Sequence, residues 1–379
     1  MKNSLNTYLM LIWLVGLLLL DFVAPQILPY KPSFPYVNTI LVPWGPKALY
    51  SWANFDGVHY LTIVAKGYFG TGAIQAFFPL YPLLVGLVAN VFGNPITSGI
   101  LISLTSLTVA LYYLHKLVII DHSSVIAKRT IWLILLFPTA FFFSALYTES
   151  LFFMLSVLCF YFVRQQRFFW AAVFAGLASA TRITGIILLP AILIEMYAYY
   201  QTKPKLFHFS LLGKLIGYIT IAGSGLMGFM LYLAKVFHDP LLFLHVQSSF
   251  GAGRQTDRLI LLPQVFWRYA KMLVTVEPHS WLYFTVVSEF VAAVGFLVLA
   301  IMAFKKTRLS YAVYALLSYL IPTLTGTFTS LPRYVLVIFP LFLVLAQNLK
   351  GFNFKVFCLL SGILLCINTI LFIQGYWVA

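Results

Sequence analysis

The chain contains only nine acidic residues among 379, so each carboxylate can be considered in turn as a possible catalyst. Asp56 lies in the stretch SWANFDGVHYLTIVAKGY (residues 51–68), far from either end of the chain. An Asp at the start of a helix often caps it. A carboxylate that faces an apolar, half-dry surface instead has a raised proton affinity and can take a proton from a hydroxyl group. The residues alone leave both interpretations of Asp56 open, helix cap and general base.

Three other acids also lie in or next to apolar segments. Glu149 begins an apolar run, and a helix start suits an acid because of the helix dipole, so this interpretation is favoured over direct catalysis. Asp239 precedes Pro240, as residues of turns and helix starts do. Glu289 lies well inside an apolar run, where a carboxylate is costly unless it faces a cavity or a partner. The sequence names no partner for Glu289.

Two arginines are candidates for binding an anion. Arg182 lies in an apolar region, and Arg333 lies in the turn SLPRY, directly before Tyr334. A planar guanidinium can bind a phosphate through paired hydrogen bonds. Snorkelling toward the membrane surface would also explain Arg182, and interfacial anchoring would explain Arg333. Lys66 could assist a phosphate or contact lipid headgroups.

No familiar cofactor motif accompanies these residues. The sequence contains no phosphate-binding glycine loop, zinc-ligand spacing or nucleophile elbow, and GAGRQ (251–255) is too short and misplaced for a dinucleotide site. The three cysteines lie inside apolar runs, where they are expected to pack. We therefore predict no cofactor, and a divalent metal is possible but has no supporting residues.

The composition places these residues in a membrane protein. The chain is 62% hydrophobic and 9% charged, with a mean hydropathy of +0.95, whereas soluble domains are nearer half apolar and a quarter charged. The apolar runs are long and do not alternate, which indicates helices rather than a barrel. We predict an all-α polytopic membrane protein, a bundle of about ten or eleven transmembrane helices that forms a single domain over residues 1–379.

The net charge of +15 does not predict nucleic-acid binding. Lys and Arg cluster in short loops between apolar runs, which is the pattern that orients membrane helices. We therefore predict that the basic loops are cytoplasmic, among them 127–129, 164–167, 201–205, 305–308 and 348–355. The segments 25–76, 236–280 and 329–334 then lie on the opposite, outer face.

Individual runs predict local features. The run 168–200 is too long for one span and is interrupted by TRITG, which predicts two short helices. The run 77–93 begins FFPLYP and is expected to be short or re-entrant. The run 130–146 is expected to be a further span. The long outer loops are rich in aromatic residues, which favours interfacial helices, and 258–273 has the pattern of one.

Several blocks of the sequence resemble one known family. FDGVHYLTIVAKGY followed by AFFPLYPLL is similar to the signature of the PIG-V family, the mannosyltransferases that add the second mannose to glycosylphosphatidylinositol precursors. The later blocks come in the family's order and cover most of the chain: FPTAFFFSALYTESLFFMLS (137–156), ASATRITGIILLP (178–190), DPLLFLHVQSSFG (239–251) and SLPRYVLVIFPLF (330–342).

The resemblance implies a fold and a reaction. The PIG-V family belongs to the GT-C class of multi-spanning glycosyltransferases, which use a polyprenyl-phosphate sugar as donor at the outer or lumenal face. That class places a catalytic acid in its first outer loop, where Asp56 falls. The family often has Arg-Trp-Asp where this chain has Asn54-Phe55-Asp56. If the missing arginine holds phosphate in relatives, another cation replaces it here or the donor differs.

These observations lead to one hypothesis and one alternative. The hypothesis is an inverting transfer of a hexose, expected to be mannose, to a lipid-linked or glycan acceptor on the non-cytoplasmic face, with Asp56 as general base. The expected substrate-binding residues are Arg333, Arg182, Glu149, His59, Tyr334, Lys66 and Asp239. The alternative is a transporter or flippase of lipids or lipid-linked sugars, although the sequence shows no inverted repeat. Either protein is expected in the cell membrane if the source is a prokaryote, which we expect, and in the endoplasmic reticulum if it is a eukaryote, and the sequence does not identify a protein partner.

Overall fold

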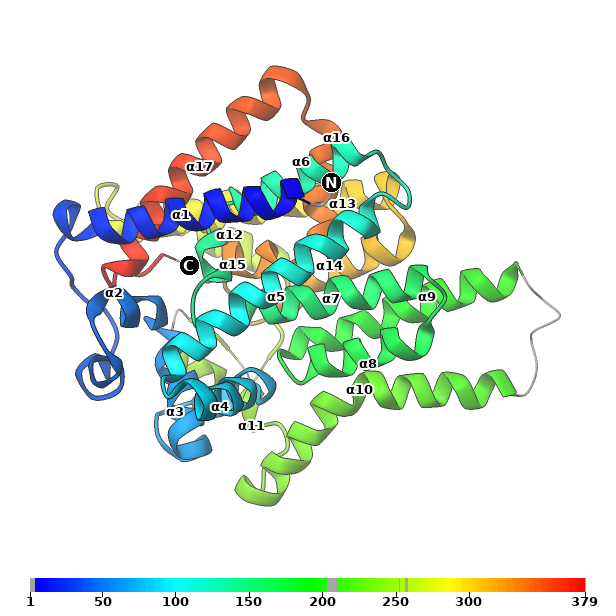
Figure 1. Cartoon of the computed structure of the whole chain (residues 1–379), viewed down its shortest axis with the longest axis horizontal. Helices are drawn as coiled ribbons and strands as arrows, with labels where there is room; N and C mark the ends of the chain where they lie inside the picture. Colours follow the sequence, from blue (N-terminus) through cyan, green and yellow to red (C-terminus); the bar gives the residue numbers. More distant parts are fainter. Residues whose placement is uncertain (1–3, 203–209, 252, 256–257, 379) are drawn as a thin grey trace.

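The computed structural model describes residues 4–202, 210–251, 253–255 and 258–378 (Figure 1). Within these residues the regular structure is entirely helical, which confirms the predicted all-α class. Most of the predicted basic loop at 201–205 lies outside the described residues.

Six helices of the described chain are long and apolar enough to cross a membrane, which confirms a multi-pass membrane protein. They are α1 (Ser4–Ile27), α5 (Pro95–Val118), α9 (Leu188–Gln201) with the preceding 3-10 turn η7 (Ile183–Ile187), α10 (Ser210–Phe237), α13 (Trp281–Lys306) and α17 (Gly351–Ile373). Four further apolar helices are shorter: α4 (Leu80–Phe92), α8 (Phe168–Ser179), α14 (Leu309–Thr323) and α16 (Phe339–Asn348). The described helices thus provide fewer full-length spans than the ten or eleven predicted, because several apolar runs are divided.

The divisions follow local sequence signals. The run 168–200 forms α8 and α9 on either side of a turn at Arg182, as predicted. The run 130–146 does not form one span as expected: α6 (Ser124–Leu135) ends before Pro138, and only the 3-10 turn η6 (Ala140–Phe143) follows. Helices usually end at or before the residue that precedes a proline. The run 77–93 forms the 13-residue α4, whose length of about 20 Å is less than the ~30 Å hydrocarbon core.

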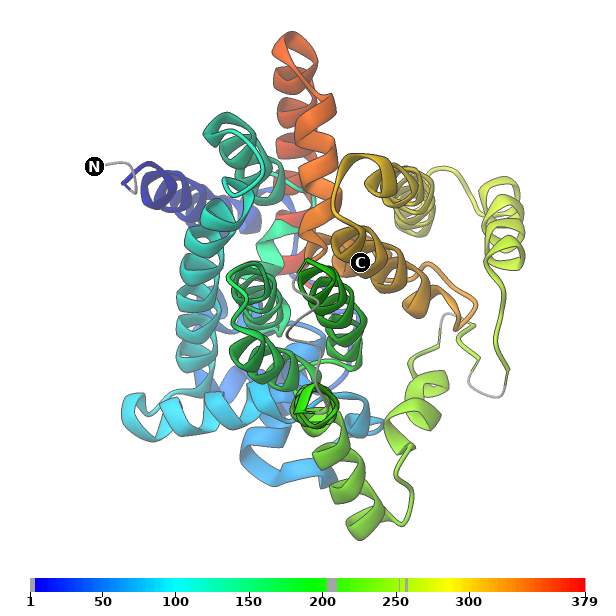
Figure 2. The same cartoon turned by 90° about the vertical axis from the view of Figure 1, so that its right-hand side faces the viewer.

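The helix α7 (Glu149–Arg164) lies at the centre of the molecule and packs against α5, α8 and α9 (Figure 2, where α7, α8 and α9 are green). The helices α8 and α10 also approach each other very closely. A Cβ atom added to Gly225 of α10 would lie 2.2 Å from the carbonyl oxygen of Gly176 of α8. The two helices therefore meet backbone to backbone, which glycine allows and larger residues would prevent.

The two long loops contain short helices. The first carries α2 (Lys47–Tyr50), the 3-10 turn η3 (Ser51–Ala53) and α3 (Asp56–Lys66), which lie at the lower left of Figure 1. The second carries α11 (Leu242–His245), η9 (Val246–Phe250) and α12 (Leu262–Thr275). The helix predicted at 258–273 is thus present as α12, which buries Val265 and Tyr269 and exposes Trp267 and Val274. Its position at a membrane surface stays a prediction.

Candidate active site

Four charged side chains from distant parts of the chain meet in one buried cluster. An Nη1–H of Arg333 donates a hydrogen bond to Oδ2 of Asp56 at 2.7 Å. The Nε atom of Arg333 lies 3.2 Å from Oε1 of Glu149, and that oxygen also accepts a hydrogen bond from Nη1 of Arg182 at 2.9 Å. Positive and negative groups alternate along this charge cluster, Asp56–Arg333–Glu149–Arg182, so each charge has an opposite neighbour.

Each member of the charge cluster lies in the first turn of a helix or directly before one. Asp56 is the first residue of α3, and Glu149 is the first residue of α7. Arg182 precedes η7, and Arg333 lies on the short helix α15 (Leu331–Leu336). Both acids therefore have the helix-start position that the sequence predicts, and the positive end of a helix dipole favours them there. The structure adds that both also bind arginine.

The burial of the cluster makes this pairing necessary. Glu149 is 1% exposed and Arg333 is 8% exposed, and an uncompensated charge in such a place costs several kcal/mol. Burial alone would lower the pKa of Arg333, but the nearby Asp56 and Glu149 outweigh it and hold that pKa well above its usual value. The guanidinium therefore keeps its charge. Among the described residues, Oε2 of Glu149 has no hydrogen-bond partner and is a spare acceptor.

The backbone that carries Asp56 is fixed on both sides. The preceding Phe55 has φ +60° and ψ −111°, a conformation that is costly for a residue other than glycine and that clusters at functional sites. The hydroxyl of Tyr147 donates to the carbonyl of Asn54 at 2.7 Å and accepts from the N–H of Asp56 at 3.2 Å. The ring of Phe55 is held by an aromatic group formed by Phe34, Phe372 and Trp377. Asp56 is therefore presented to Arg333 from a rigid support.

Asn54 occupies the position where the resembled pattern often has arginine. Its side chain is fully buried, and its amide donates to the carbonyl of Phe372 at the end of α17. The cation that contacts Asp56 is instead Arg333, which comes from a segment 277 residues later in the chain.

His59 lies one helical turn after Asp56, on the same face of α3. Its ring stacks on Phe77 with a centroid distance of 4.6 Å, and Nδ1 lies 2.8 Å from Oγ1 of Thr71. Burial lowers the pKa of His59 below its usual 6.5, and the nearby Asp56 only partly opposes this effect. The imidazole is therefore neutral at pH 7 and can give or accept a hydrogen bond.

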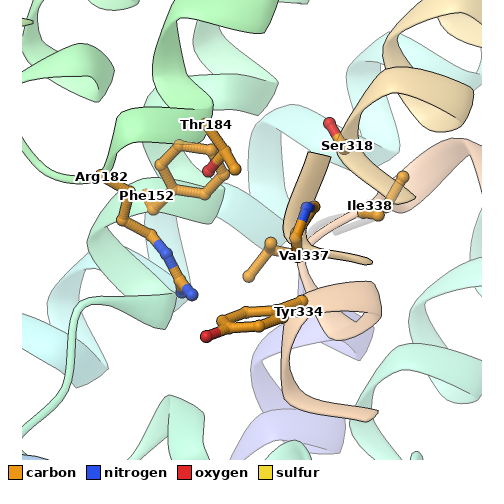
Figure 3. A pocket seen from close by; sticks show the side chains of 8 residues that line it. Phe152, Arg182, Thr184, Ser318, Tyr334, Val337 and Ile338 are labelled. Atoms are coloured by element: carbon orange, nitrogen blue, oxygen red, sulfur yellow. The ribbon is translucent and has the colours of Figure 1, made fainter. Parts of the chain in front are cut away.

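Tyr334 borders a small cavity beside the charge cluster. Figure 3 shows Arg182 and Tyr334 directed toward each other at one end of this cavity. The guanidinium carbon atoms of Arg182 and Arg333 lie 5.3 and 5.6 Å from the centre of the Tyr334 ring. The remaining wall is mostly apolar and consists of Phe152, Thr184, Ser318, Pro322, Val337 and Ile338. The space inside the cavity that a water-sized molecule can reach is only about 10 Å³, enough for roughly one water molecule and far less than a ligand pocket of ~300–1,000 Å³.

Arg254 is a further cation near Tyr334 that the sequence analysis did not select. Burial would raise the pKa of Tyr334, but the charges of Arg254, Arg333 and Arg182 outweigh it and lower that pKa. Nη1 of Arg254 donates to Oε1 of Gln247 at 3.2 Å. The only sequence signal for Arg254 as an anion-binding residue is its place in a long outer loop. The segment GAGRQ that contains it is unsuited to a nucleotide, which gives no reason to select the arginine by itself.

Two predicted binding residues lie away from the charge cluster. Lys66 is exposed and lies ten residues after Asp56 on α3, about 15 Å by helical rise. Asp239 binds Nδ1 of His245 at 2.7 Å and the N–H of Leu241 at 2.9 Å. These are the contacts of a turn and helix-start residue, and a role of Asp239 in substrate binding stays a prediction. The part of the chain that the structure describes also contains no group of three or more His, Cys, Asp or Glu residues placed to hold a metal ion.

Comparison with known proteins supplies the family. A family model described as mannosyltransferase (PIG-V) matches residues 7–239. The matched region includes Asp56, Glu149 and Arg182 and ends before Arg333. No curated protein and no solved structure gives a significant match. The match covers more than half of the chain and agrees with its apolar helices, and the chain therefore belongs to the PIG-V mannosyltransferase family of multi-pass membrane glycosyltransferases.

Proposed function

We propose that the protein transfers a mannosyl residue from a polyprenyl-phosphate mannose to a hydroxyl group of a glycolipid acceptor, on the non-cytoplasmic face and with inversion at the anomeric carbon. The observation that carries the proposal is the partly buried contact between Asp56 and Arg333, next to a second carboxylate–arginine pair. A carboxylate beside a guanidinium offers a proton acceptor and a phosphate ligand within one small volume.

In the proposed reaction Asp56 takes the proton of the acceptor hydroxyl group. The hydroxyl oxygen forms a bond to the anomeric carbon of mannose as the bond from that carbon to the phosphate oxygen breaks. The lipid phosphate leaves with the electron pair. The Asp56 side chain is 18% exposed, whereas that of Glu149 is 1% exposed, so Asp56 is the acid more accessible to an acceptor.

The arginines provide the electrostatic half of the mechanism. Cations that are already in place contribute most where negative charge develops, here on the leaving phosphate. A donor phosphate that binds Arg333 would compete with Asp56 for the guanidinium and free the carboxylate to act as base. Glu149 keeps Arg182 in position, and Arg254 adds a positive charge that the two acids of the cluster do not balance. Arg333 and Arg254 would thereby replace the arginine that the resembled pattern carries before its acid.

The distribution of charge supports the proposed outer location of the site. The helix α3, which carries Asp56, lies at the lower left of Figure 1, whereas the last residues of α9 and the first residues of α10 lie at the far right. Two other ion pairs are built from residues in or next to the predicted basic loops, Asp121 with Arg164 and Glu195 with Arg308. The helix α3 thus lies on the opposite side of the molecule from these ends of α9 and α10, which supports an outer location for Asp56.

The test is transfer of radiolabelled mannose from polyprenyl-phosphate mannose by the purified protein in liposomes that contain cell-derived glycolipids. Asp56→Asn should lower kcat by about 10²- to 10⁴-fold, the usual contribution of a general base. Asp121→Asn removes an acid that binds Arg164 outside the charge cluster and should leave kcat unchanged. Wild-type turnover by Asp56→Asn would exclude it as the base. Movement of the donor across the bilayer without a new glycoside would identify a flippase instead.

A further inference from the structure

Glu289 is a buried acid that the proposed mechanism does not use. It lies on the apolar helix α13 and is 3% exposed. A carboxyl group at such a place is costly and calls for specific partners. The structure identifies partners that the sequence could not name.

Both oxygens of Glu289 accept hydrogen bonds. Oε2 accepts from the hydroxyl of Tyr269 on α12 at 2.5 Å, and Oε1 accepts from the backbone N–H of Ser330 at 3.1 Å. Tyr269 and Thr327 are also joined, with 3.2 Å between their hydroxyl oxygens. Glu289 therefore links two helices to the segment that immediately precedes α15.

The contact with Ser330 falls at a strained position. Ser330 has φ +64° and ψ +10°, in the left-handed region that residues other than glycine rarely adopt, and it caps α15. Its carbonyl accepts from the N–H of Arg333 at 3.0 Å. On the other side, Oγ1 of Thr139 donates to the carbonyl of Pro332 at 2.9 Å. The first turn of α15 is thus held from two directions, and that turn sets the place of Arg333.

We propose that Glu289 is a positioning residue: through the N–H of Ser330 it fixes the start of α15 so that the Arg333 guanidinium reaches Asp56 and Glu149. The inference rests on the proposed role of Arg333 in binding the donor phosphate. A displacement of about 1 Å in such a group can cost as much as 10²-fold in rate. Among the residues that the structure describes, Glu289 is the acceptor for the Ser330 N–H.

The test compares Glu289→Leu with Glu289→Gln in the full-length protein. Leucine removes both acceptors. Glutamine keeps one oxygen to accept from Ser330, and its amide can donate to the Tyr269 hydroxyl, which can then donate to Thr327. We expect Glu289→Leu to lower kcat/KM for the polyprenyl-phosphate donor by about 10- to 100-fold, and Glu289→Gln to restore it to within a few-fold of wild type. Hydrogen exchange of peptides that cover 326–337 should rise in the leucine variant and return to the wild-type level in the glutamine variant.

Glu195→Leu is the matched control, because Glu195 is also buried and binds Arg308 and Ser310 in another part of the bundle. It should lower the melting temperature without changing exchange at 326–337 or donor kinetics. Unchanged exchange at 326–337 in Glu289→Leu would overturn the positioning role, whatever the activity. If exchange rose but the donor kinetics stayed unchanged, the hydrogen bond from Ser330 to Glu289 would still be shown to hold the start of α15. That result would instead refute the role of Arg333 in donor binding.

Discussion

Arg333 is the residue at which the proposed mechanism can be tested most sharply. Its guanidinium reaches two carboxylates through two different nitrogen atoms, Asp56 through Nη1 at 2.7 Å and Glu149 through Nε at 3.2 Å. In Arg333→Lys the charge remains, but one ammonium group on a flexible stem cannot reproduce the planar fork. One of the two contacts should therefore be lost or weakened.

The size of the effect follows from that lost contact. A hydrogen bond to a charged group contributes about 1.5–3 kcal/mol, and each ~1.4 kcal/mol corresponds to a factor of ten in rate. We expect Arg333→Lys to lower kcat/KM for the donor by about 10- to 150-fold and to lower the melting temperature as well. Initial rates over a range of polyprenyl-phosphate mannose concentrations, together with thermal melts in detergent, would measure both quantities.

Arg308→Lys provides the control for this experiment. Arg308 binds Glu195 through two nitrogen atoms, at 2.8 and 3.0 Å, outside the charge cluster. Its replacement should affect stability at most and leave donor kinetics unchanged. If Arg333→Lys also kept wild-type kcat/KM, the reasoning that this guanidinium binds the leaving phosphate would be wrong.

Three further predictions concern the support of the site and the packing of the bundle. Tyr147→Phe removes the hydroxyl that binds both Asn54 and Asp56, so kcat should fall and the protein should lose about 1–3 kcal/mol of stability, seen as a lower melting temperature. The control Tyr81→Phe loses a buried hydrogen bond to Gly99 and should lower only the melting temperature. Burial lowers the folded-state pKa of His59, so the contribution of this residue to stability is complete above about pH 6.5 and is lost as pH falls through the lowered pKa. Thermal melts from pH 8 to pH 5 should therefore depend less on pH in His59→Phe than in the wild type. An identical pH dependence of the two proteins would contradict a lowered pKa. Gly225→Ala should destabilise the α8–α10 contact by about 1–3 kcal/mol, whereas Gly228→Ala on the same helix meets no atom within 4 Å and should have little effect on thermal melts.

The pairing in the charge cluster also bears on the interpretation of Glu149. Its position at the start of α7 is sufficient to explain an acid there. Its contacts with two arginines nevertheless make it part of the same electrostatic unit as Asp56. Replacing a single member of this unit leaves an opposite charge buried and unpaired, so variants of these four residues should be interpreted together with their stability.

The sequence by itself determined the features that depend on local chemistry. The apolar composition specifies membrane helices, the interruption at TRITG separates α8 from α9, and the amphipathic pattern of 258–273 forms α12. These three predictions are correct because hydropathy, periodicity and the signals of proline and glycine act over one or two helical turns. The family also follows from the order of its motifs along the chain.

The tertiary structure alone decided which charged residues meet. Asp56 and Arg333 are 277 residues apart, and their contact depends on how α3, α7 and α15 pack, which no local pattern encodes. The same packing leaves Lys66 and Asp239 outside the cluster and brings Arg254 near Tyr334. It also gives Glu289 its partners on α12 and before α15. An ion pair or hydrogen bond acts only within a few ångströms, and the global arrangement of the helices sets those distances.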